Sequence, residues 1–383
     1  MRRLACLLTV LLPVAGCTSV TASTEARPPV ITISPKPDET TANPDRGLTV
    51  RVRNGTLTSV SAFAAQQPVV GSYNPAHTIW TSDWTLIPAT VYVVNATATG
   101  AGGLVTRTAA RFRTLRPSHP PGAVVISPRP KETVGVGMPI IVDFGTPIVD
   151  RVAVERALEV RTDTPVEGAW RWFSPTQVVY RPRTFWAPRQ RVVFTAHLAG
   201  IRLAPGTYGT ADRTVEFTIG RKMVSTVDTI THRMVVRRHG RIVQRMAISA
   251  GKATTREYTT TSGVHLTMDK GNPVRMLSPG RMPGEPGYYD LLINYAVRIS
   301  NSGEYVHALN NLWAQGRRNV SHGCVNARPD QAAWFYTNAL RGDPVVITGT
   351  ERTLEPENGW GYWQLPWAEW RKGSALSGAA PYY

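Results

Sequence analysis

Ile33-Ser-Pro-Lys-Pro-Asp-Glu-Thr40 is the stretch on which the fold depends, because the chain contains it twice. It returns 93 residues later as Ile126-Ser-Pro-Arg-Pro-Lys-Glu-Thr133. A second set of matches lies 100 residues apart and pairs Pro88, Trp80, Val93, Ala96 and Gly100 with Pro188, Tyr180, Val193, Ala196 and Gly200. The second copy therefore carries a short insertion. Two copies of about 95 residues each have the size of small β-sandwiches.

Local patterns within the repeat agree with strands. Apolar and polar residues alternate over 48–52 and 90–96 and in part over 192–198, and turn signals such as Asn54-Gly55 separate the runs. Helical periodicity is confined to 150–158. We therefore predict a mainly β protein that begins with two tandem immunoglobulin-like sandwiches, residues 30–117 and 122–219. The proline-rich junction 116–122 makes the pair a semi-rigid spacer.

Neither copy of the repeat contains a catalytic cluster. The histidines in this half, His77, His119 and His197, stand alone in the sequence. We interpret each as a structural or surface histidine.

From Gly220 the pattern changes to a third, β-rich domain, predicted over 220–350. Residues 232–248 read as a hairpin that turns at His239-Gly240, and strands are predicted over 291–299, 304–306 and 345–347. Arg328-Pro329-Asp330 starts a short helix, which is predicted to run through Leu340 and to end at Gly342.

Two other segments of this half are unusual. Residues 269–289 are rich in Gly, Pro and Met without periodicity, which is typical of a lid or binding loop, the alternative being a disordered insertion. The last segment, 351–383, holds Trp360, Trp363, Trp367 and Trp370. So many large aromatic residues predict a C-terminal extension that folds back onto the chain.

Length and charge limit the possible partners. The chain has 383 residues, enough for two to four domains, and a net charge of +17. Such a charge suits a membrane surface or an anionic wall polymer, or it only aids solubility. Nucleic acid is disfavoured, because the basic residues are spread along the chain and form no single basic arm. The chain is expected to act as a monomer.

The N-terminus reads as an export signal. Arg2 and Arg3 precede a short apolar run that ends in Val14-Ala-Gly-Cys17, and about 20 apolar residues would be needed to span a bilayer. This ending resembles a bacterial lipobox, which predicts a signal peptide over 1–16, lipidation of Cys17 and a tether over 17–29. The alternative is an ordinary cleavage site with an incidental cysteine. On the lipoprotein interpretation, Cys324 is the sole free thiol of the mature chain.

The stretch Ser321-His-Gly-Cys-Val-Asn326 carries the chemistry, together with His307 upstream. A lone cysteine with histidines in reach is the arrangement expected of a nucleophile, and the base raises its thiolate fraction. His307 ends a predicted strand, so we assign it as general base and acid. No carboxylate lies next to it, and we expect a backbone carbonyl near Ala308 to orient its ring.

Other residues of this stretch have supporting roles. Gly323 lets backbone N–H groups of residues 322–324 approach a substrate carbonyl, so it is predicted to form the oxyanion hole. His322 is expected to be held locally beside Ser321, and Asn326 to hold substrate. The alternative is a buried, inert cysteine beside unrelated histidines.

His307 and the hexapeptide together resemble the signature of L,D-transpeptidases with a YkuD-type catalytic domain. The two sandwiches, the lipobox and the tryptophan-rich tail extend the resemblance to actinobacterial members over nearly the whole mature chain. The resemblance implies a Cys324 thioester with a peptidoglycan stem tetrapeptide, release of D-alanine, and attack by a diaminopimelate side-chain amine that forms a 3→3 cross-link.

The same resemblance implies that Tyr289, Ser302, Gly303 and Asn326 contact substrate, that no cofactor or metal is used, and that a carbapenem acylates Cys324. The chain would then be a lipid-anchored enzyme on the outer face of the membrane that reaches into the wall. One departure is that Ala308 stands where the family often has serine, which raises the question of what positions His307.

Two other functions are considered. A cell-wall cysteine peptidase or sortase is one, but papain-like enzymes place cysteine before histidine, and a sortase would show a separate cysteine and arginine. A non-catalytic, lipid-anchored wall-binding protein is the other, and the complete hexapeptide argues against it.

Overall fold

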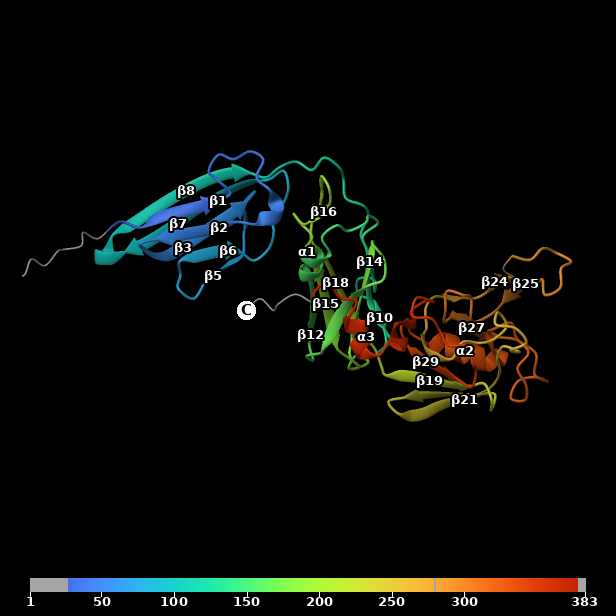
Figure 1. Cartoon of the computed structure of the whole chain (residues 1–383). Coiled ribbons are helices and arrows are strands. Elements are labelled where there is room, and N and C mark those ends of the chain that lie inside the picture. The colour runs from blue at the N-terminus through green and yellow to red at the C-terminus, as the bar shows by residue number, and fades with distance from the viewer. Residues whose placement is uncertain (1–26, 279, 378–383) are drawn as a thin grey trace, which may run out of the picture.

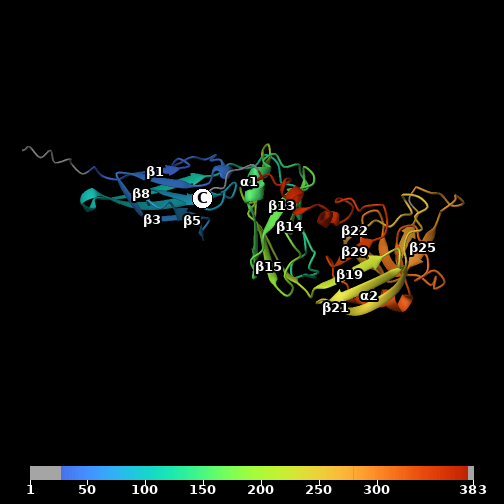
Figure 2. The same cartoon turned by 60° about the horizontal axis from the view of Figure 1, so that its bottom comes forward.

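The computed structural model describes residues 27–278 and 280–377. Two β-sandwiches and a third, larger domain follow one another along the chain. Figures 1 and 2 both show the first sandwich at one end, the second in the middle and the third domain at the other end. The predicted signal peptide, Cys17 and nearly all of the predicted tether lie outside the described residues.

The first sandwich packs two four-stranded sheets face to face. One sheet has the order β1 (Val30–Ser34), β2 (Thr49–Arg53), β6 (Ile79–Ser82), β5 (Gly71–Tyr73), and the other the order β4 (Gln67–Pro68), β3 (Gly55–Ala64), β7 (Val91–Gly100), β8 (Val105–Arg113). Short 3-10 turns lie at η1 (Pro44–Arg46) and η2 (Ala101–Gly103). Val50, Val94 and Ala96 point into the shared core, so the alternation read from the sequence is confirmed.

The second sandwich repeats this plan. Its sheets are β13 (Gly168–Trp172), β14 (Gln177–Pro182), β11 (Ile140–Asp143), β9 (Val125–Ser127) and β10 (Thr133–Val134), β18 (Arg213–Ile219), β15 (Arg191–Ala196), β12 (Leu158–Thr162). A small ribbon joins β16 (Arg202–Ala204) to β17 (Thr207–Tyr208). The predicted helix is present as α1 (Arg151–Arg156), where Asp150 caps the first turn by accepting from the Ala153 N–H at 2.9 Å.

The repeated octapeptide adopts the same structure in both copies. The Glu39 carboxylate accepts from the Lys36 N–H at 3.1 Å, and the Glu132 carboxylate accepts from the Arg129 N–H at 2.8 Å. Each octapeptide also contains a cis Ser–Pro bond. The sequence repeat is therefore a structural repeat.

The third domain is built on a nine-stranded sheet. Its order is β22 (Gly263–Leu266), β29 (Pro344–Thr348), β19 (Met223–Asp228), β20 (Arg233–Arg238), β21 (Arg241–Ser249), β28 (Val325–Ala327), β27 (Tyr305–Ala308), β26 (Ala296–Arg298), β23 (Lys270–Gly271). The helix α2 (Pro329–Asn338) buries Ala332 and Phe335 in the core of this domain. The predicted hairpin at His239-Gly240 is present as β20 and β21.

Three details of this domain differ from the sequence predictions. Part of 269–289 is strand, because β24 (Val274–Leu277) pairs with β25 (Asp290–Ile293). The predicted strand over 291–299 is broken at Tyr295, whose φ of 51° is left-handed. The helix α2 ends at Asn338, so Leu340 and Gly342 lie beyond it.

Gly342 has a tertiary role that its position in the sequence does not reveal. Its φ is 85°, and a Cβ at this position would lie 2.5 Å from the Cβ of Met138 in the second sandwich. Gly342 also accepts the Gly137 N–H at 2.9 Å. The glycine is therefore required by the close approach of two domains, and it does not cap the helix.

The tryptophan-rich extension packs back onto the chain, as predicted. It forms η3 (Gly361–Gln364) and α3 (Trp367–Arg371), and Trp370 is fully buried against Val179 and Tyr362. The indole N–H of Trp370 donates to the Ala169 carbonyl at 2.9 Å. The extension therefore covers one face of the second sandwich.

Arg181 lies inside this packing. It is 2% exposed, its guanidinium carbon lies 4.6 Å from the ring centroid of Trp370, and it donates to the Leu365 carbonyl at 2.7 Å. Burial lowers the pKa of Arg181 to about 10. Because Arg181 belongs to β14, the extension is attached to the second sandwich by charge as well as by apolar contact.

A direct ion pair also joins the second sandwich to the third domain. The Arg341 guanidinium contacts both carboxylate oxygens of Glu132 at 2.9 Å. Glu132 is the second copy's equivalent of Glu39 in the repeated octapeptide. Residues of the repeat therefore hold the third domain in place.

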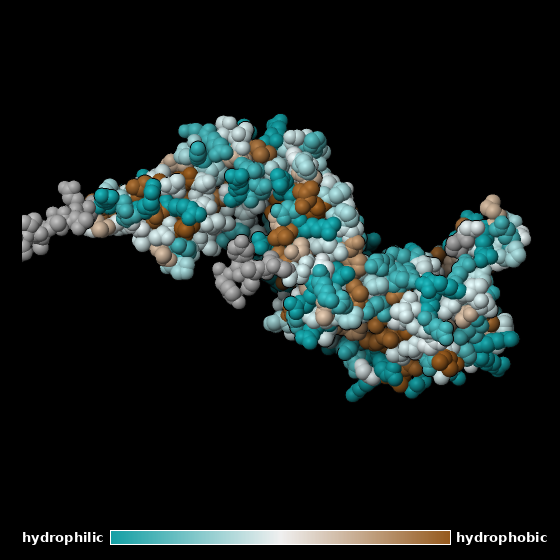
Figure 3. Space-filling view, viewed as in Figure 1, coloured by the Kyte–Doolittle hydropathy of each residue, from teal (hydrophilic) through white to brown (hydrophobic). Residues whose placement is uncertain are grey.

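One face of the molecule can be described by its hydropathy. Apart from scattered apolar patches, the face drawn in Figure 3 is mostly hydrophilic over all three domains. Among the described residues, none of the helices is both long enough and apolar enough to cross a membrane.

Candidate active site

A cavity of about 200 Å³ in the third domain brings most of the predicted site residues together. Cys324, His307, Ser321, His322, Tyr289 and Asn326 all line it. His307 lies on β27 and Asn326 on β28, and these two residues are register partners in a parallel pair. Because the strands are neighbours in the central sheet, the histidine and the hexapeptide are held on one rigid support.

The hexapeptide forms a tight turn that is held by two hydrogen bonds of the Ser321 hydroxyl. The Ser321 hydroxyl donates to the Cys324 carbonyl at 2.6 Å and accepts from the Gly323 N–H at 3.1 Å. Gly323 has a φ of 130°, which a residue with a side chain rarely adopts. The Gly323 N–H was expected to face a substrate carbonyl, and here it is engaged by Ser321. It would have to change partners to serve an oxyanion.

The turn is also tied to the strands behind it. Thr260 donates its hydroxyl to the Gly323 carbonyl at 2.7 Å and accepts from the Gly251 N–H at 2.8 Å. Asn319, just before the hexapeptide, accepts from the Ala250 N–H at 2.9 Å and donates to the Thr229 carbonyl at 2.9 Å. The position of Cys324 is thus fixed by hydrogen bonds from several segments.

His307 is buried, at 4% exposure, and its Nδ1 lies 2.9 Å from the Ala308 carbonyl oxygen. A carbonyl oxygen only accepts, so Nδ1 carries the proton and Nε2 is left as the basic nitrogen. Burial lowers the pKa of His307 although the Ala308 carbonyl raises it. The ring is therefore neutral at physiological pH, as a general base requires.

Cys324 is in its thiol form. Its pKa is raised to about 12, mainly by burial; the Tyr305 backbone hydrogen bond lowers it, and the Glu304 carboxylate contributes to the rise. The thiol donates to the Gly303 carbonyl oxygen at 3.5 Å. Few thiolates therefore exist in the resting state at physiological pH.

Aromatic rings form one wall of the cavity. The Tyr289 and His322 rings stack with centroids 5.2 Å apart and an angle of 6° between planes, and the Tyr258 ring meets His322 from another side at 4.5 Å. Arg281, from the loop between β24 and β25, pairs with Glu257 at 3.0 Å. The Arg281 guanidinium carbon also lies 5.7 Å from the ring centroid of Tyr258, so this loop contacts the wall, and a lid over 269–289 stays a prediction.

Ser302 and Gly303, the other predicted substrate contacts, lie outside the lining of the cavity. The Ser302 hydroxyl lies 3.0 Å from that of Ser300, and it accepts from the Asn358 amide of the C-terminal extension at 3.0 Å. Gly303 reaches the site through its carbonyl contact with Cys324. The extension therefore supports the loop that faces the nucleophile.

Sequence reasoning missed a buried polar cluster behind Cys324. Glu304, 4% exposed, accepts from the Thr261 N–H at 2.7 Å and from the Thr261 hydroxyl at 2.7 Å. His265, fully buried, lies 4.0 Å from the Glu304 carboxylate. The adjacency of Glu304 to the predicted Ser302-Gly303 contact was the available signal, but an isolated glutamate in a strand reads as solvent-facing. The missed lining residues are mostly apolar and include Met276, Leu291, Ile293, Leu309, Asn311 and Val320.

A protonated thiol, a neutral imidazole of fixed tautomer and a concave, partly apolar pocket together can carry out acyl transfer. The cavity holds a thiol able to act as a nucleophile, and His307 brings to it a ring whose Nε2 is the basic nitrogen. The apolar lining residues and the aromatic wall form a concave surface suited to a peptide-like substrate.

Comparisons with known proteins agree with this geometry. Residues 222–347 match the model of the L,D-transpeptidase catalytic domain family, and residues 39–202 match that of the bacterial Ig domain family. The chain is 35% identical to L,D-transpeptidase 2 of Mycobacterium tuberculosis (strain CDC 1551 / Oshkosh) over 336 residues, which is 86% of this chain and 81% of that protein.

Two further similarities extend the comparison. L,D-transpeptidase 5 of Mycobacterium tuberculosis (strain H37Rv) is 33% identical over 378 residues, covering 96% of this chain and 82% of that one. The solved structure of LD transpeptidase LdtMt1 in complex with imipenem superposes with a TM-score of 0.52 at 32% identity, covering 60% of this chain and 99% of that one.

Proposed function

Because the chain belongs to the L,D-transpeptidase family, we propose that Cys324 transfers an acyl group between stem peptides of peptidoglycan. The observation that carries this proposal is the shared cavity of Cys324 and His307, with the Nδ1 proton of His307 held on the Ala308 carbonyl. Of the two nitrogens of the His307 ring, this arrangement leaves Nε2 as the one that can accept the thiol proton.

The first half-reaction cleaves a stem tetrapeptide. The Cys324 sulfur attacks the diaminopimelate carbonyl that precedes terminal D-alanine, and His307 Nε2 takes the thiol proton as the carbon–sulfur bond forms. The tetrahedral intermediate then collapses, and His307 returns that proton to the departing D-alanine amine. The product is a thioester on Cys324.

The second half-reaction forms the cross-link. The side-chain amine of diaminopimelate in another stem attacks the thioester carbonyl, and His307 takes a proton from the amine. The carbon–sulfur bond breaks, the thiol is restored with that proton, and a 3→3 amide remains. No cofactor is needed, because both steps are proton-balanced by one imidazole.

The remaining predicted site residues have assisting roles in this proposal. Tyr289 and Asn326 contact the donor peptide inside the cavity, and Ser302 and Gly303 contact it from the loop beside the thiol. Ser321 and His322 shape the turn. The oxyanion is bound by backbone N–H groups of 322–324, with Gly323 joining after it leaves Ser321.

We further propose that the enzyme is exported and lipidated on Cys17, so that it works from the membrane into the wall. We propose that the chain is divided into a signal peptide (1–16), a tether (17–29), two sandwiches (30–117 and 122–219), a catalytic domain (220–350) and a C-terminal extension (351–383). The basic sequence supports contact with anionic wall polymers.

One assay tests the reaction. The purified chain without residues 1–17 is incubated with a disaccharide-tetrapeptide, and mass spectrometry follows the dimer and free D-alanine. We expect dimer with wild type, none with Cys324→Ala, and a rate about 10²–10⁴-fold lower with His307→Gln. His77→Gln, far along the chain in the first sandwich, serves as the matched control. Stem hydrolysis without dimer would instead identify a peptidase.

A carbapenem supplies an independent readout. The β-lactam carbonyl should acylate Cys324, adding the mass of one intact inhibitor to wild type and none to Cys324→Ala. If the thiol stays unmodified while the protein is folded, the proposed nucleophile is wrong.

A further inference from the structure

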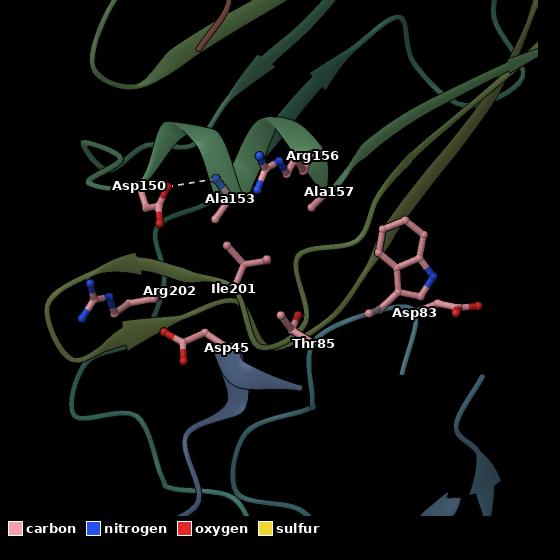
Figure 4. Close-up of a pocket in the computed structure, with 10 residues that line it drawn as sticks. Asp45, Asp83, Thr85, Asp150, Ala153, Arg156, Ala157, Ile201 and Arg202 are labelled. Carbon is pink, nitrogen blue, oxygen red and sulfur yellow. Dashed lines mark hydrogen bonds between the residues drawn. The ribbon is translucent and has the colours of Figure 1, made fainter. Parts of the chain in front are cut away.

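A second cavity, of about 360 Å³, lies between the two sandwiches and far along the chain from Cys324. Figure 4 shows α1 of the second sandwich as one wall, with Asp45 and Thr85 of the first sandwich facing it and Ile201 between them. Binding sites occur preferentially where two domains meet. The cavity plays no part in the acyl transfer described above.

The junction that forms this cavity is built from specific contacts. The Trp84 ring of the first sandwich stacks on His197 of the second, with centroids 3.5 Å apart and planes at 10°. The Thr85 hydroxyl donates to the Ala199 carbonyl at 2.5 Å, and the Tyr208 hydroxyl donates to Asn43 at 3.0 Å. His197, interpreted from the sequence as a structural histidine, is part of this interface.

Charged side chains of both signs line the cavity. The first sandwich contributes Asp45 and Asp83, and the second contributes Asp150, Arg156 and Arg202. Trp84 also lines the cavity and is 38% exposed, although it is stacked on His197. The lining therefore offers carboxylates, guanidinium groups and an aromatic ring to a ligand.

Two of these charged side chains have no hydrogen-bond or ion-pair partner among the described residues, although both act electrostatically on Tyr208. Within the described part of the chain, Asp45 and Arg202 make neither a side-chain hydrogen bond nor an ion pair. Elsewhere in the second sandwich, exposed opposite charges do pair, as in Arg183–Glu167 at 3.1 Å. Asp83 and Asp150 each use one oxygen, accepting from Ser72 at 2.8 Å and from the Ala153 N–H at 2.9 Å.

A ligand that complements this lining carries a positive and a negative group. Carboxylates recognise an ammonium, an aromatic face adds a cation–π contact, and an arginine fork recognises a carboxylate. A neutral sugar would leave these charges unmatched, and a purely anionic polymer would meet three aspartates. An amino acid with both groups free on one carbon fits.

We propose that this cavity binds the zwitterionic amino-acid end of an uncross-linked peptidoglycan stem peptide. The inference rests on the proposed function, since that function supplies the substrate class: the side chain of diaminopimelate ends in a carbon that bears an ammonium and a carboxylate. Asp45 holds the ammonium, and Arg202 holds the carboxylate. The sandwiches thus bind the wall at a point of their own in addition to separating the catalytic domain from the membrane.

The test uses the chain without residues 1–17 and with Cys324→Ala, so that no acyl transfer occurs. Meso-diaminopimelic acid and the tripeptide L-Ala-γ-D-Glu-meso-diaminopimelate are titrated while the indole ¹⁵N–H signal of Trp84, assigned with Trp84→Phe, is followed by NMR. We expect a saturable shift, with an affinity at least tenfold lower in Asp45→Asn and in Arg202→Gln. Asp38→Asn and Arg213→Gln are the matched controls on exposed positions of each sandwich.

Three results would overturn the proposal. They are no shift at millimolar probe, an equal affinity in all variants, or equal binding of a tripeptide whose side-chain amine is acetylated. Binding that persists although the dimer assay fails would leave this site standing without the proposed function. If both proposals hold, the Arg202→Gln variant with Cys324 intact should form dimer from soluble substrate at the wild-type rate. The same variant should co-sediment less with insoluble peptidoglycan than the wild type does.

Discussion

The Nδ1 atom of His307 lies 2.9 Å from the carbonyl oxygen of Ala308, the residue that follows it in the chain. The acceptor belongs to the backbone, so the ring is oriented without help from the Ala308 side chain. Ala308→Ser should therefore leave the rate of carbapenem acylation within about threefold of wild type. A rise or fall of tenfold in stopped-flow acylation kinetics would show that a hydroxyl at this position takes part in aiming the ring.

The resting protonation state can be measured directly. Since burial raises the pKa of Cys324 to about 12, the thiolate fraction should increase about tenfold per pH unit from pH 7 to pH 10. The rate of iodoacetamide alkylation, followed by intact mass, should increase in the same proportion. Alkylation that levels off near pH 8 would instead indicate a preformed thiolate.

Low pH should reduce activity by protonating His307. Its pKa is lowered by burial, so the ring is neutral above that lowered value, and base catalysis is lost only as the pH falls through it. The pH profile of kcat/KM for carbapenem acylation should therefore hold its plateau to below pH 6.5. An acid limb centred above 6.5 would mean that the imidazole is stabilised as a cation.

Ser321 should support catalysis by holding the turn that carries Cys324. Its hydroxyl bonds both the Cys324 carbonyl and the Gly323 N–H, so Ser321→Ala removes two hydrogen bonds from the turn. We expect a loss of about 1–3 kcal/mol in stability and a fall in kcat greater than any rise in KM. Ser374→Ala, in the C-terminal extension, is a control for the loss of a serine hydroxyl remote from the turn.

Glu304 should tune the nucleophile. Its carboxylate accepts two hydrogen bonds from Thr261 and raises the pKa of Cys324. Glu304→Gln keeps the shape but removes the charge, so alkylation at pH 8 should become faster even if the protein is less stable. Unchanged alkylation in a folded variant would assign Glu304 a purely structural role.

The sequence allowed the sandwiches and the nucleophile to be predicted because each depends on local pattern. The octapeptide repeat marks equivalent turns, and alternation in β2 and β7 marks their buried faces. The hexapeptide is contiguous, so its residues can be recognised together in the sequence without knowledge of the fold. The partner of His307 was predicted for the same reason, since Ala308 is its neighbour.

The missed features depend on segments distant in sequence. Strands β24 and β25 stabilise each other as a hairpin within a Gly- and Pro-rich region, whose composition conceals them. Gly342 reads as a helix cap until the second sandwich is brought against it. The buried carboxylate of Glu304 accepts hydrogen bonds from Thr261, which lies 43 residues away in the chain. Local periodicity does not reveal a partner at that distance.

The tryptophan-rich extension should contribute strongly to stability. Trp370 is fully buried and its indole N–H is satisfied by Ala169, so Trp370→Ala should cost about 3–5 kcal/mol. The exposed Trp313, at 53%, is the control, and Trp313→Ala should cost less than about 1 kcal/mol. Urea unfolding would separate the two, and equal losses would contradict the assigned packing.

The contacts of Arg181, Glu132 and Gly342 also have a practical consequence for anyone who works with fragments of this enzyme. A piece cut to residues 220–350 would leave Arg341 without its ion-pair partner and would lack Asn358, which bonds Ser302 beside the nucleophile. A piece from about residue 122 to residue 377 keeps the whole second sandwich and every one of these contacts. Inhibitor screening against a shorter fragment would sample a loop beside Cys324 that the whole enzyme holds differently.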